Sequence, residues 1–315
     1  MDINKIYNGH CLDVLKTFPN ESVNCCVTSP PYWALRDYGH DNQLGLESTF
    51  DEYINKLCNI FDEVKRVLRK DGTCWVVIGD TYYTKSGSGF VNDNLNPKSK
   101  EEIDNSTGIN KANELRGKNP KLHKCLSMIP FRFSIEMVNR GWILRNTIIW
   151  YKPNCMPASV KDRFTVDFEY VFFFVKNKKY WFEQQFEECQ EVSIERAKYG
   201  WNCDRANNRT GINTEKMGDR FVNPQGRNKR AVWQVTTKPF KEAHFAVYPP
   251  ELIEPMIKAG CPEDGIVLDP FMGSGTTAVV ASGLNRNYIG IELNQEYIGI
   301  AEARIYEATK QLTIV

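Results

Sequence analysis

The segment from Val267 to Thr277 constrains the fold more than any other part of the 315-residue chain. It reads VLDPFMGSGTT, an apolar strand that ends in Asp269 and turns through two glycines into a helix. Glycines in such a turn let the backbone approach a ligand closely, and the start of the helix presents free N–H groups. The next strand ends in Glu292, where nucleotide-binding folds commonly hold ribose hydroxyls. These features predict a parallel α/β sheet with a nucleotide-like ligand at the carboxyl ends of its strands. The carboxylate of Asp269 would suit a cationic ammonium group of that ligand.

A second turn, also at the end of a predicted strand, has different chemistry. The apolar run Val23 to Thr28 is followed by Ser29, Pro30, Pro31, Tyr32 and Trp33. The two prolines fix the backbone, so that the Ser29 hydroxyl and the Pro30 carbonyl can accept hydrogen bonds from one bound group. Tyr32 and Trp33 offer aromatic faces on which a planar base, extruded from a duplex, could stack. Taken alone, the same pattern also fits a rigid turn without a function.

The remaining elements alternate between strands and helices, which is typical of a parallel α/β fold. Strands are predicted over Val23 to Thr28, Thr73 to Gly79, Gly265 to Asp269 and Tyr288 to Glu292, with a hairpin of Trp142 to Tyr151 and Phe168 to Val175. Helices are predicted over Phe50 to Arg69, Pro130 to Asn139, Pro250 to Ala259, Thr276 to Gly283 and Gln295 to Ala308.

Two polar stretches interrupt this pattern. Residues 84–127 are rich in Ser, Gly, Asn and Lys, and fit either a solvated linker or a segment that orders on a polyanionic partner. From about Glu191 to Arg230 nine basic residues face four acidic ones, with aromatic and amide side chains between them. This composition favours nucleic-acid binding over a solvated surface loop. The predicted DNA contacts are Trp33, Arg196, Lys198, Arg205, Arg209, Arg227, Lys229 and Arg230.

Composition excludes several classes of protein. With 42% hydrophobic and 25% charged residues the chain is globular, and its formal charge of +1 means that any affinity for nucleic acid must come from local clusters. No run approaches the roughly 20 apolar residues of a membrane span, and the N-terminus does not resemble a signal peptide, so we expect a cytoplasmic protein. The ten cysteines are expected to be buried reduced thiols, with no metal site.

Together the motifs resemble those of the S-adenosylmethionine-dependent amino-methyltransferases of DNA. TSPPYWALRDYG is similar to the catalytic motif of that family, DPFMGSGTT to its methionine-binding turn, YIGIEL to its ribose-binding strand and HFAVYPPEL to a segment that closes over the cofactor. GWILRNTIIWYKPNCMPASVKDR and FEYVFFFVK are similar to segments that accompany SPPY in bacterial and phage members. The catalytic motif precedes the cofactor motif by about 240 residues, with the basic region between them, as in the circularly permuted beta class.

The resemblance implies a Rossmann-like methyltransferase fold with a mainly parallel seven-stranded sheet, circularly permuted, and an inserted target-recognition region. It divides the chain into a catalytic half at 1–83, an insertion at 84–127, further strands at 128–183, the recognition region at 184–240 and a cofactor-binding half at 241–315. It implies catalytic roles for Ser29, Pro30, Pro31 and Tyr32. The implied cofactor-binding residues are Asp269, Phe271, Gly273, Ser274, Gly275, Thr276, Glu292, His244, Phe245, Thr28 and Cys11. One departure is His10, where family members usually have Asp.

The implied activity is transfer of a methyl group from S-adenosylmethionine to the exocyclic amino group of a flipped base in double-stranded DNA. Members with Ser before Pro-Pro-Tyr are more often specific for cytosine than for adenine, so cytosine is favoured and adenine is the alternative. Methylation of RNA or of a protein amide is less favoured, because those families place the Gly-rich motif first. A DNA-binding relative without catalysis is a further alternative. A homodimer and a partner restriction endonuclease are both compatible with the resemblance.

Overall fold

The computed structural model describes residues 1–40, 42–84, 114–118, 120–191, 195, 223, 225–238 and 247–312. The chain divides into two compact units, one comprising Met1–Glu183 with Ala231–Val315 and the other comprising Gln184–Arg230. The predicted contacts Arg196, Lys198, Arg205 and Arg209, the predicted cofactor residues His244 and Phe245, and most of the polar insertion lie outside the described residues.

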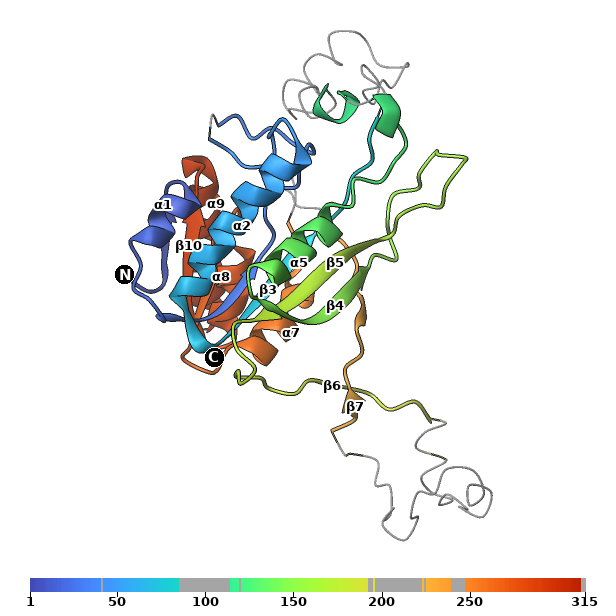
Figure 1. Ribbon diagram of the computed structural model, residues 1–315. Coiled ribbons are helices and arrows are strands. Elements are labelled where there is room, and N and C mark those ends of the chain that lie inside the picture. The colour runs from blue at the N-terminus through green and yellow to red at the C-terminus, as the bar shows by residue number, and fades with distance from the viewer. Residues whose placement is uncertain are drawn as a thin grey trace. The chain divides into compact units, whose positions relative to one another are not determined.

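The large unit is built on one mainly parallel sheet, as predicted (Figure 1). In the described residues this sheet has eight strands in the order β1-β10-β9-β2-β3-β5-β4-β8, and β5 is antiparallel to both of its neighbours. The strands are β1 (Lys5–Asn8), β2 (Val23–Thr28), β3 (Leu68–Ile78), β4 (Ile143–Tyr151), β5 (Phe168–Val175), β8 (Val232–Gln234), β9 (Ile266–Asp269) and β10 (Asn287–Glu292). The predicted count of seven was wrong. β1 and β8 were not recognised in the sequence, because strands of four and three residues are too short to show a pattern.

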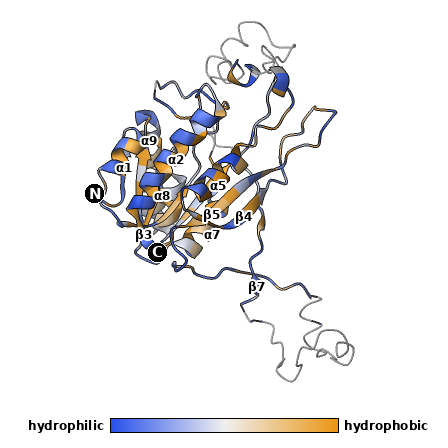
Figure 2. Cartoon of the chain, viewed as in Figure 1, coloured by the Kyte–Doolittle hydropathy of each residue, from blue (hydrophilic) through white to orange (hydrophobic). Residues whose placement is uncertain are grey.

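Helices cover both faces of the sheet. α1 (Cys11–Lys16), α2 (Phe50–Val67) and α5 (Ile129–Asn139) contribute to the core on one face, and α7 (Pro250–Gly260), α8 (Thr276–Gly283) and α9 (Gln295–Leu312) to the core on the other. Alternation along β2 shows the division, because Cys26 packs into the first core whereas Cys25 and Val27 pack into the second. Figure 2 shows the matching pattern on α2 and α5, where hydrophilic and hydrophobic residues lie on different sides of each helix.

Local signals explain where α2 begins and ends. The side chain of Thr49 caps the helix by accepting a hydrogen bond from the Glu52 backbone N–H (3.2 Å). The helix ends at Val67, two residues before the predicted boundary, because Leu68 adopts an extended conformation and starts β3. β2 and β3 are parallel, so the predicted strand–helix–strand unit is confirmed.

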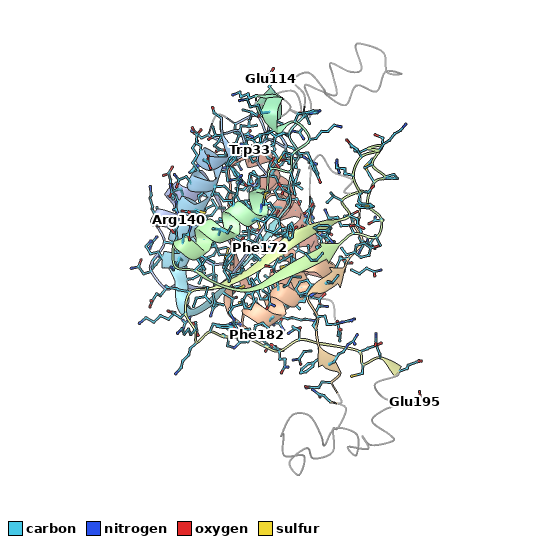
Figure 3. All side chains as sticks on the ribbon, turned by 45° about the vertical axis from the view of Figure 1, so that its right-hand side comes forward. Trp33, Glu114, Arg140, Phe172, Phe182 and Glu195 are labelled. Atoms are coloured by element: carbon cyan, nitrogen blue, oxygen red, sulfur yellow. The ribbon has the colours of Figure 1, made fainter. Side chains whose placement is uncertain are left out.

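The predicted hairpin of β4 and β5 is also confirmed, with Tyr151 opposite Phe168 at the end where the connecting loop leaves the strands. Phe172 of β5, labelled in Figure 3, packs against Phe133 of α5 with the ring centres 6.4 Å apart. Because β5 runs against β3, its first residues lie at the edge where the parallel strands end. Residues at this end of the hairpin therefore line the same cavity as both turns singled out in the sequence.

The smaller unit, Gln184–Arg230, contains a two-stranded ladder of β6 (Phe186–Glu187) and β7 (Arg227–Asn228). Within it the carboxylate of Glu187 binds both Arg227 (2.9 Å) and Arg230 (2.5 Å). A single-turn 3-10 helix, η1 (Pro120–Leu122), belongs to the large unit. No helix in the described part of the chain is long and apolar enough to cross a membrane.

The expectation that the cysteines are buried is only partly confirmed. Six described cysteines are buried, namely Cys11, Cys25, Cys26, Cys58, Cys74 and Cys261. Cys125 is exposed, and Cys155 and Cys189 are half-buried, so these three contradict the expectation. They lie in connecting segments, where an apolar neighbour in the sequence does not ensure a place in the core.

Candidate active site

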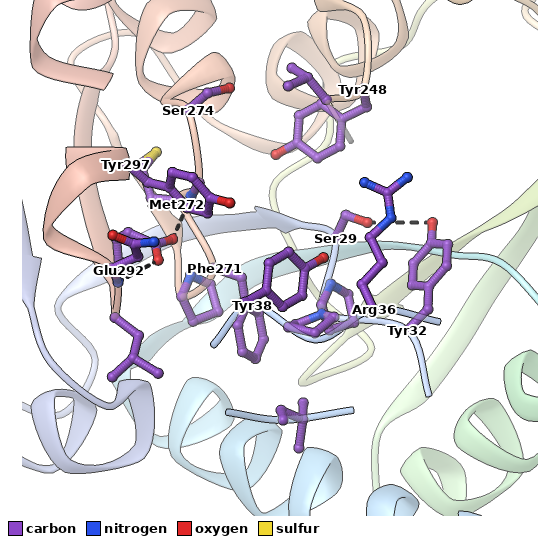
Figure 4. A pocket seen from close by; sticks show the side chains of 18 of the residues that line it. Ser29, Tyr32, Arg36, Tyr38, Tyr248, Phe271, Met272, Ser274, Glu292 and Tyr297 are labelled. Atoms are coloured by element: carbon purple, nitrogen blue, oxygen red, sulfur yellow. Dashed lines mark hydrogen bonds between the residues drawn. The ribbon is translucent and has the colours of Figure 1, made fainter. Parts of the chain in front are cut away.

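A cavity of about 630 Å³ lies where the carboxyl ends of the central strands meet. The turns after β2, β9 and β10 contribute to its lining, together with residues around the end of β4 and the start of β5. Figure 4 shows Ser29 and Tyr32 on one side of this cavity and Met272 and Glu292 on the other. The two turns that the sequence singled out, which are about 240 residues apart in the chain, thus open into one space.

The Ser29–Tyr32 turn is held by contacts from outside itself. Tyr53 of α2 donates a hydrogen bond to the Pro31 carbonyl (2.8 Å), which fixes the second proline. The Tyr32 hydroxyl donates to Glu169 Oε2 (2.7 Å), and Ser29 Oγ lies 3.4 Å from the Tyr32 hydroxyl, a longer contact drawn as a dashed line in Figure 4. Ser29 and Pro30 both line the cavity. This arrangement leaves the acceptor pair predicted from the sequence at the cavity wall.

Glu169 is the anchor of this side of the cavity. It forms an ion pair with Lys152, and the Lys152 ammonium also lies 4.1 Å from the centre of the Trp150 ring. Gly79, at the end of β3, makes room for the contact, because a Cβ there would lie 2.7 Å from Tyr32 Cε2. Burial, and then the charge of Glu169, raise the pKa of Tyr32 well above its ordinary value. The phenol therefore stays protonated and can keep donating to Glu169.

The Gly-rich turn is held together by Asp269. Asp269 Oδ1 accepts hydrogen bonds from Thr28 Oγ1 (2.5 Å) and the Phe271 backbone N–H (3.0 Å). Its Oδ2 accepts from Thr277 Oγ1 (2.5 Å) and the Tyr248 hydroxyl (2.9 Å). These four bonds occupy the four lone-pair positions of a carboxylate. Burial raises the pKa of Asp269, and the side chain is fully buried.

Glu292, at the end of β10, lines the cavity and holds the Gly-rich turn by hydrogen bonds. Its Oε2 accepts from the Gly273 N–H (2.8 Å), and its Oε1 accepts from the Asn294 N–H (2.8 Å). Each oxygen keeps a further lone pair for a ligand hydroxyl. Burial raises the pKa of Glu292 above its ordinary value of 4.5, although the two backbone donors oppose that rise.

The nine predicted cofactor residues that the structure describes fall into two groups. Those that line the cavity are Cys11, Phe271, Gly273, Ser274, Thr276 and Glu292, and His10 lines it as well. Burial raises the pKa of Cys11 to about 12, so that it contributes a neutral thiol to the wall.

Thr28, Asp269 and Gly275 are described but do not line the cavity. The prediction that Asp269 presents its carboxylate to a ligand is wrong for this structure, because neighbouring donors already occupy both oxygens. Thr28 acts on Asp269 rather than on the cavity. Gly275 has φ of +82°, and a Cβ there would lie 2.8 Å from Ala301 Cβ, so the glycine permits close packing of α9 rather than of a ligand.

Trp33 is a further correction. Its side chain is 2% exposed, its indole N–H donates to the Glu47 carbonyl (3.1 Å), and its ring packs edge-on against Phe50 and Tyr83. Figure 3 labels it among packed side chains. A ring enclosed in this way has no face for a base, so the predicted DNA contact at Trp33 is wrong. The contacts predicted at Arg227, Lys229 and Arg230 stay predictions.

The sequence did not single out three residues that shape the site, namely Tyr248, Lys152 and Glu169. Tyr248 lies within HFAVYPPEL, lines the cavity and donates to Asp269. Lys152 directly follows β4, and Glu169 is the second residue of β5. In the sequence, Lys152 and Glu169 are visible only as charged residues at the ends of two otherwise apolar strands. The pairing of those strands had to be known before the two residues could be placed at the site.

Comparison with known proteins agrees with this geometry. The DNA methylase family model, N6_N4_Mtase, matches residues 23–303. The type II methyltransferase M.Cfr9I of Citrobacter freundii is 42% identical over 302 residues, covering 95% of this chain and 87% of that protein.

Solved structures share the fold. PvuII DNA methyltransferase (cytosine-N4-specific) has a TM-score of 0.62 and 19% identity, covering 98% of this chain and 91% of that one. The M1.HpyAVI–SAM complex has a TM-score of 0.52 and 18% identity, covering 96% and 98%. With the match over 23–303 and two strand-end turns meeting in one cavity, the chain belongs to the DNA methylase family.

Proposed function

We propose that the protein transfers a methyl group from S-adenosylmethionine to the exocyclic amino group of a base flipped out of double-stranded DNA, with cytosine favoured. The observation that carries the proposal is the shared cavity, which has hydrogen-bond acceptors for an amino group on one side and a nucleotide-type turn on the other. Its volume of about 630 Å³ falls in the usual range for ligand pockets.

The side formed by the Gly-rich turn fits the cofactor. Glu292 can accept from two ribose hydroxyls, and Phe271 and Leu293 supply apolar surface for a purine ring. Gly273, with φ of +51°, brings the backbone to the cavity wall, and Ser274 and Thr276 add polar groups there. The structural neighbour M1.HpyAVI was solved as a complex with SAM, which supports the same ligand here. When bound, this cofactor supplies an electrophilic methyl group on a sulfonium.

The side formed by Ser29 and Pro30 fits the base. An exocyclic amino nitrogen is a poor nucleophile because its lone pair is delocalised into the ring. Ser29 Oγ and the Pro30 carbonyl accept the two amino hydrogens and so hold the nitrogen near tetrahedral, with its lone pair free to attack. Proximity and orientation then provide most of the rate enhancement, and no covalent intermediate with the enzyme is required. The Tyr32–Glu169 hydrogen bond keeps the turn in place during the transfer.

Cytosine is favoured over adenine because of the residue that begins the turn. The first residue of the turn is Ser29, the residue more often found in the cytosine-specific members that the sequence resembles. The neighbour PvuII DNA methyltransferase is named as cytosine-N4-specific, although at 19% identity its likeness extends to the fold alone.

The proposal also includes recognition of the DNA sequence by residues 184–240 and further DNA contacts from residues 84–127. It assigns the protein to the circularly permuted beta class. A homodimer or a partner endonuclease is part of the same proposal.

The test is to methylate duplex DNA with the purified protein and isotopically labelled S-adenosylmethionine, and then to separate the nucleosides. Label in N4-methylcytosine within one short sequence is the expected result. Label in N6-methyladenine would support the same methyl transfer with adenine, rather than cytosine, as the target base. The Ser29→Ala variant is the matched control for a contaminating methylase. Absence of label from DNA, with the cofactor bound, would overturn the proposal and redirect the search to RNA, protein or a non-catalytic role.

A further inference from the structure

The connection between β4 and β5 contains an unusual concentration of exposed apolar side chains. All residues from 156 to 166, here named the exposed loop, are exposed to solvent. Phe164 is 95% exposed and Met156 is 89% exposed, and Val160 and Val166 accompany them. Among the described residues, these four belong to a set of only twelve large hydrophobic side chains that are exposed. Clusters of this kind mark interaction sites more often than isolated exposed side chains do.

The exposed loop is rooted at the active site. The Lys152 backbone N–H donates to the Asp167 carbonyl (2.7 Å), which closes the base of the connection. Lys152 and Glu169, on either side of this base, line the cavity. In Figure 1 the connection extends beyond the end of the sheet where β4 stops and β5 starts. A partner that reaches the cavity at this edge therefore meets the exposed loop.

The surroundings of Phe164 are basic. Lys161 and Arg163 are exposed in the same loop, and the Arg163 guanidinium lies 3.9 Å from the centre of the Tyr82 ring. An ion pair of Asp162 with Lys124 joins the loop to a neighbouring segment that also exposes Lys118 and Lys121. The surface thus combines positive charge with a protruding aromatic ring. Positive charge favours a polyanion, and an apolar ring among cations favours one with stacked bases.

We propose that the exposed loop inserts Phe164 into the DNA duplex at the gap left by the extruded base. This inference rests on the proposed function, because it requires a base to leave the helix. Ser29 lines a cavity at the ends of the strands, and an enzyme that acts on a base in such a pocket must take that base out of the stack. Extrusion removes stacking from the two neighbouring base pairs. A phenylalanine side chain restores part of that stacking, while Lys161 and Arg163 neutralise phosphates on either side.

The experiment measures how tightly the Phe164→Ala and Phe164→Trp variants bind a DNA duplex. The duplex contains the unmodified target site of the protein, and S-adenosylhomocysteine is present. The matched control is Tyr306→Ala, which removes an aromatic side chain that is 63% exposed on α9. We expect Phe164→Ala to bind the paired duplex about tenfold more weakly, equivalent to about 1.4 kcal/mol. On a duplex with a mispaired target base, which costs less to extrude, the defect should shrink to about threefold or less. Phe164→Trp and Tyr306→Ala should bind like the wild type.

Three outcomes would overturn the inference. Wild-type affinity of Phe164→Ala for both duplexes would leave the ring without a role in DNA binding. An equal loss on both would indicate a general contact rather than insertion at the extruded base. Dissociation of a wild-type dimer into Phe164→Ala monomers in sedimentation would assign the exposed loop to self-association. Failure of the wild-type protein to methylate any DNA would instead count against the proposed function, so the two failures are distinguishable.

Discussion

The turn after β2 and the turn after β9 lie on adjacent parallel strands, and one hydrogen bond, from Thr28 Oγ1 to Asp269 Oδ1 (2.5 Å), joins them. They nevertheless use their polar groups differently. In the turn after β9, protein donors occupy every lone-pair position of the Asp269 carboxylate. The turn after β2 is braced from outside, by Tyr53 and Glu169, so that Ser29 and Pro30 face the cavity.

A polar residue in a site motif can therefore act in two ways. In the proposed function Ser29 touches the substrate, whereas Asp269 shapes the backbone of the turn assigned to the cofactor. The two kinds of residue should then affect different measured quantities. Changes at Ser29 should appear in turnover, and changes around Asp269 in cofactor affinity and folding.

The largest effect is expected for Ser29→Ala. Loss of one of two acceptors for the amino group should lower kcat by about 10²–10³-fold, as for the loss of a single donor in an oxyanion hole. Cofactor affinity, measured by calorimetry, should stay within about threefold of the wild type because Ser29 is not assigned to that ligand. Methylation at the wild-type rate would remove Ser29 from the catalytic role and erase the contrast between the turns.

Asp269→Ala should act mainly on affinity and stability. Removal of the carboxylate takes this acceptor from two buried threonine hydroxyls, the Tyr248 hydroxyl and the Phe271 N–H, and only the Tyr248 and Thr277 hydroxyls can still bond each other. Unmet bonds of this kind cost about 1–3 kcal/mol each, so the thermal midpoint should fall clearly. Asp269→Asn keeps the volume and should fold, and its cofactor affinity should fall by about tenfold or more. Cofactor binding at full strength in a folded Asp269→Asn protein would show that the turn does not depend on this residue.

Glu292→Gln should weaken cofactor binding by about tenfold at neutral pH, the effect of losing a charged acceptor. Burial raises the pKa of Glu292 above 4.5, and the ionised form is the one that accepts two hydroxyls. Wild-type affinity should therefore be complete well above that pKa and should decline as the pH falls through it. In the Gln variant this decline should be absent. Titration calorimetry over a series of pH values measures it, and parallel curves for the two proteins would contradict the assignment.

The smallest effect is expected for Glu169→Gln. Glutamine can still accept from Tyr32, but it no longer forms the ion pair with Lys152. Because the hydrogen bond that orients Tyr32 is weakened rather than lost, kcat should fall by about threefold, and KM for the cofactor should be unchanged. Tyr32→Phe is the companion variant, and it should be at least as slow. If both variants turned over like the wild type, the turn after β2 would not need its external brace.

Local pattern was sufficient for much of the fold. The bounds of α8 were predicted correctly, because glycines flank an apolar run, and β5 was found because eight successive residues are almost all apolar. The two site turns were found because proline and glycine restrict or free the backbone wherever they occur. Trp33 failed because burial depends on packing against Phe50 and Tyr83, which are distant along the chain.

The chemistry that the chain carries can be read from the order of its residues, since the acceptor turn at Ser29 and the Gly-rich turn before α8 are both local features. How these features are used depends on the folded arrangement. Parallel pairing of β2 and β9 joined two turns about 240 residues apart, and the antiparallel course of β5 placed Glu169 against Tyr32. Strand order and direction are set by burial of both faces of the sheet. Residue spacing along the chain carries no record of that order.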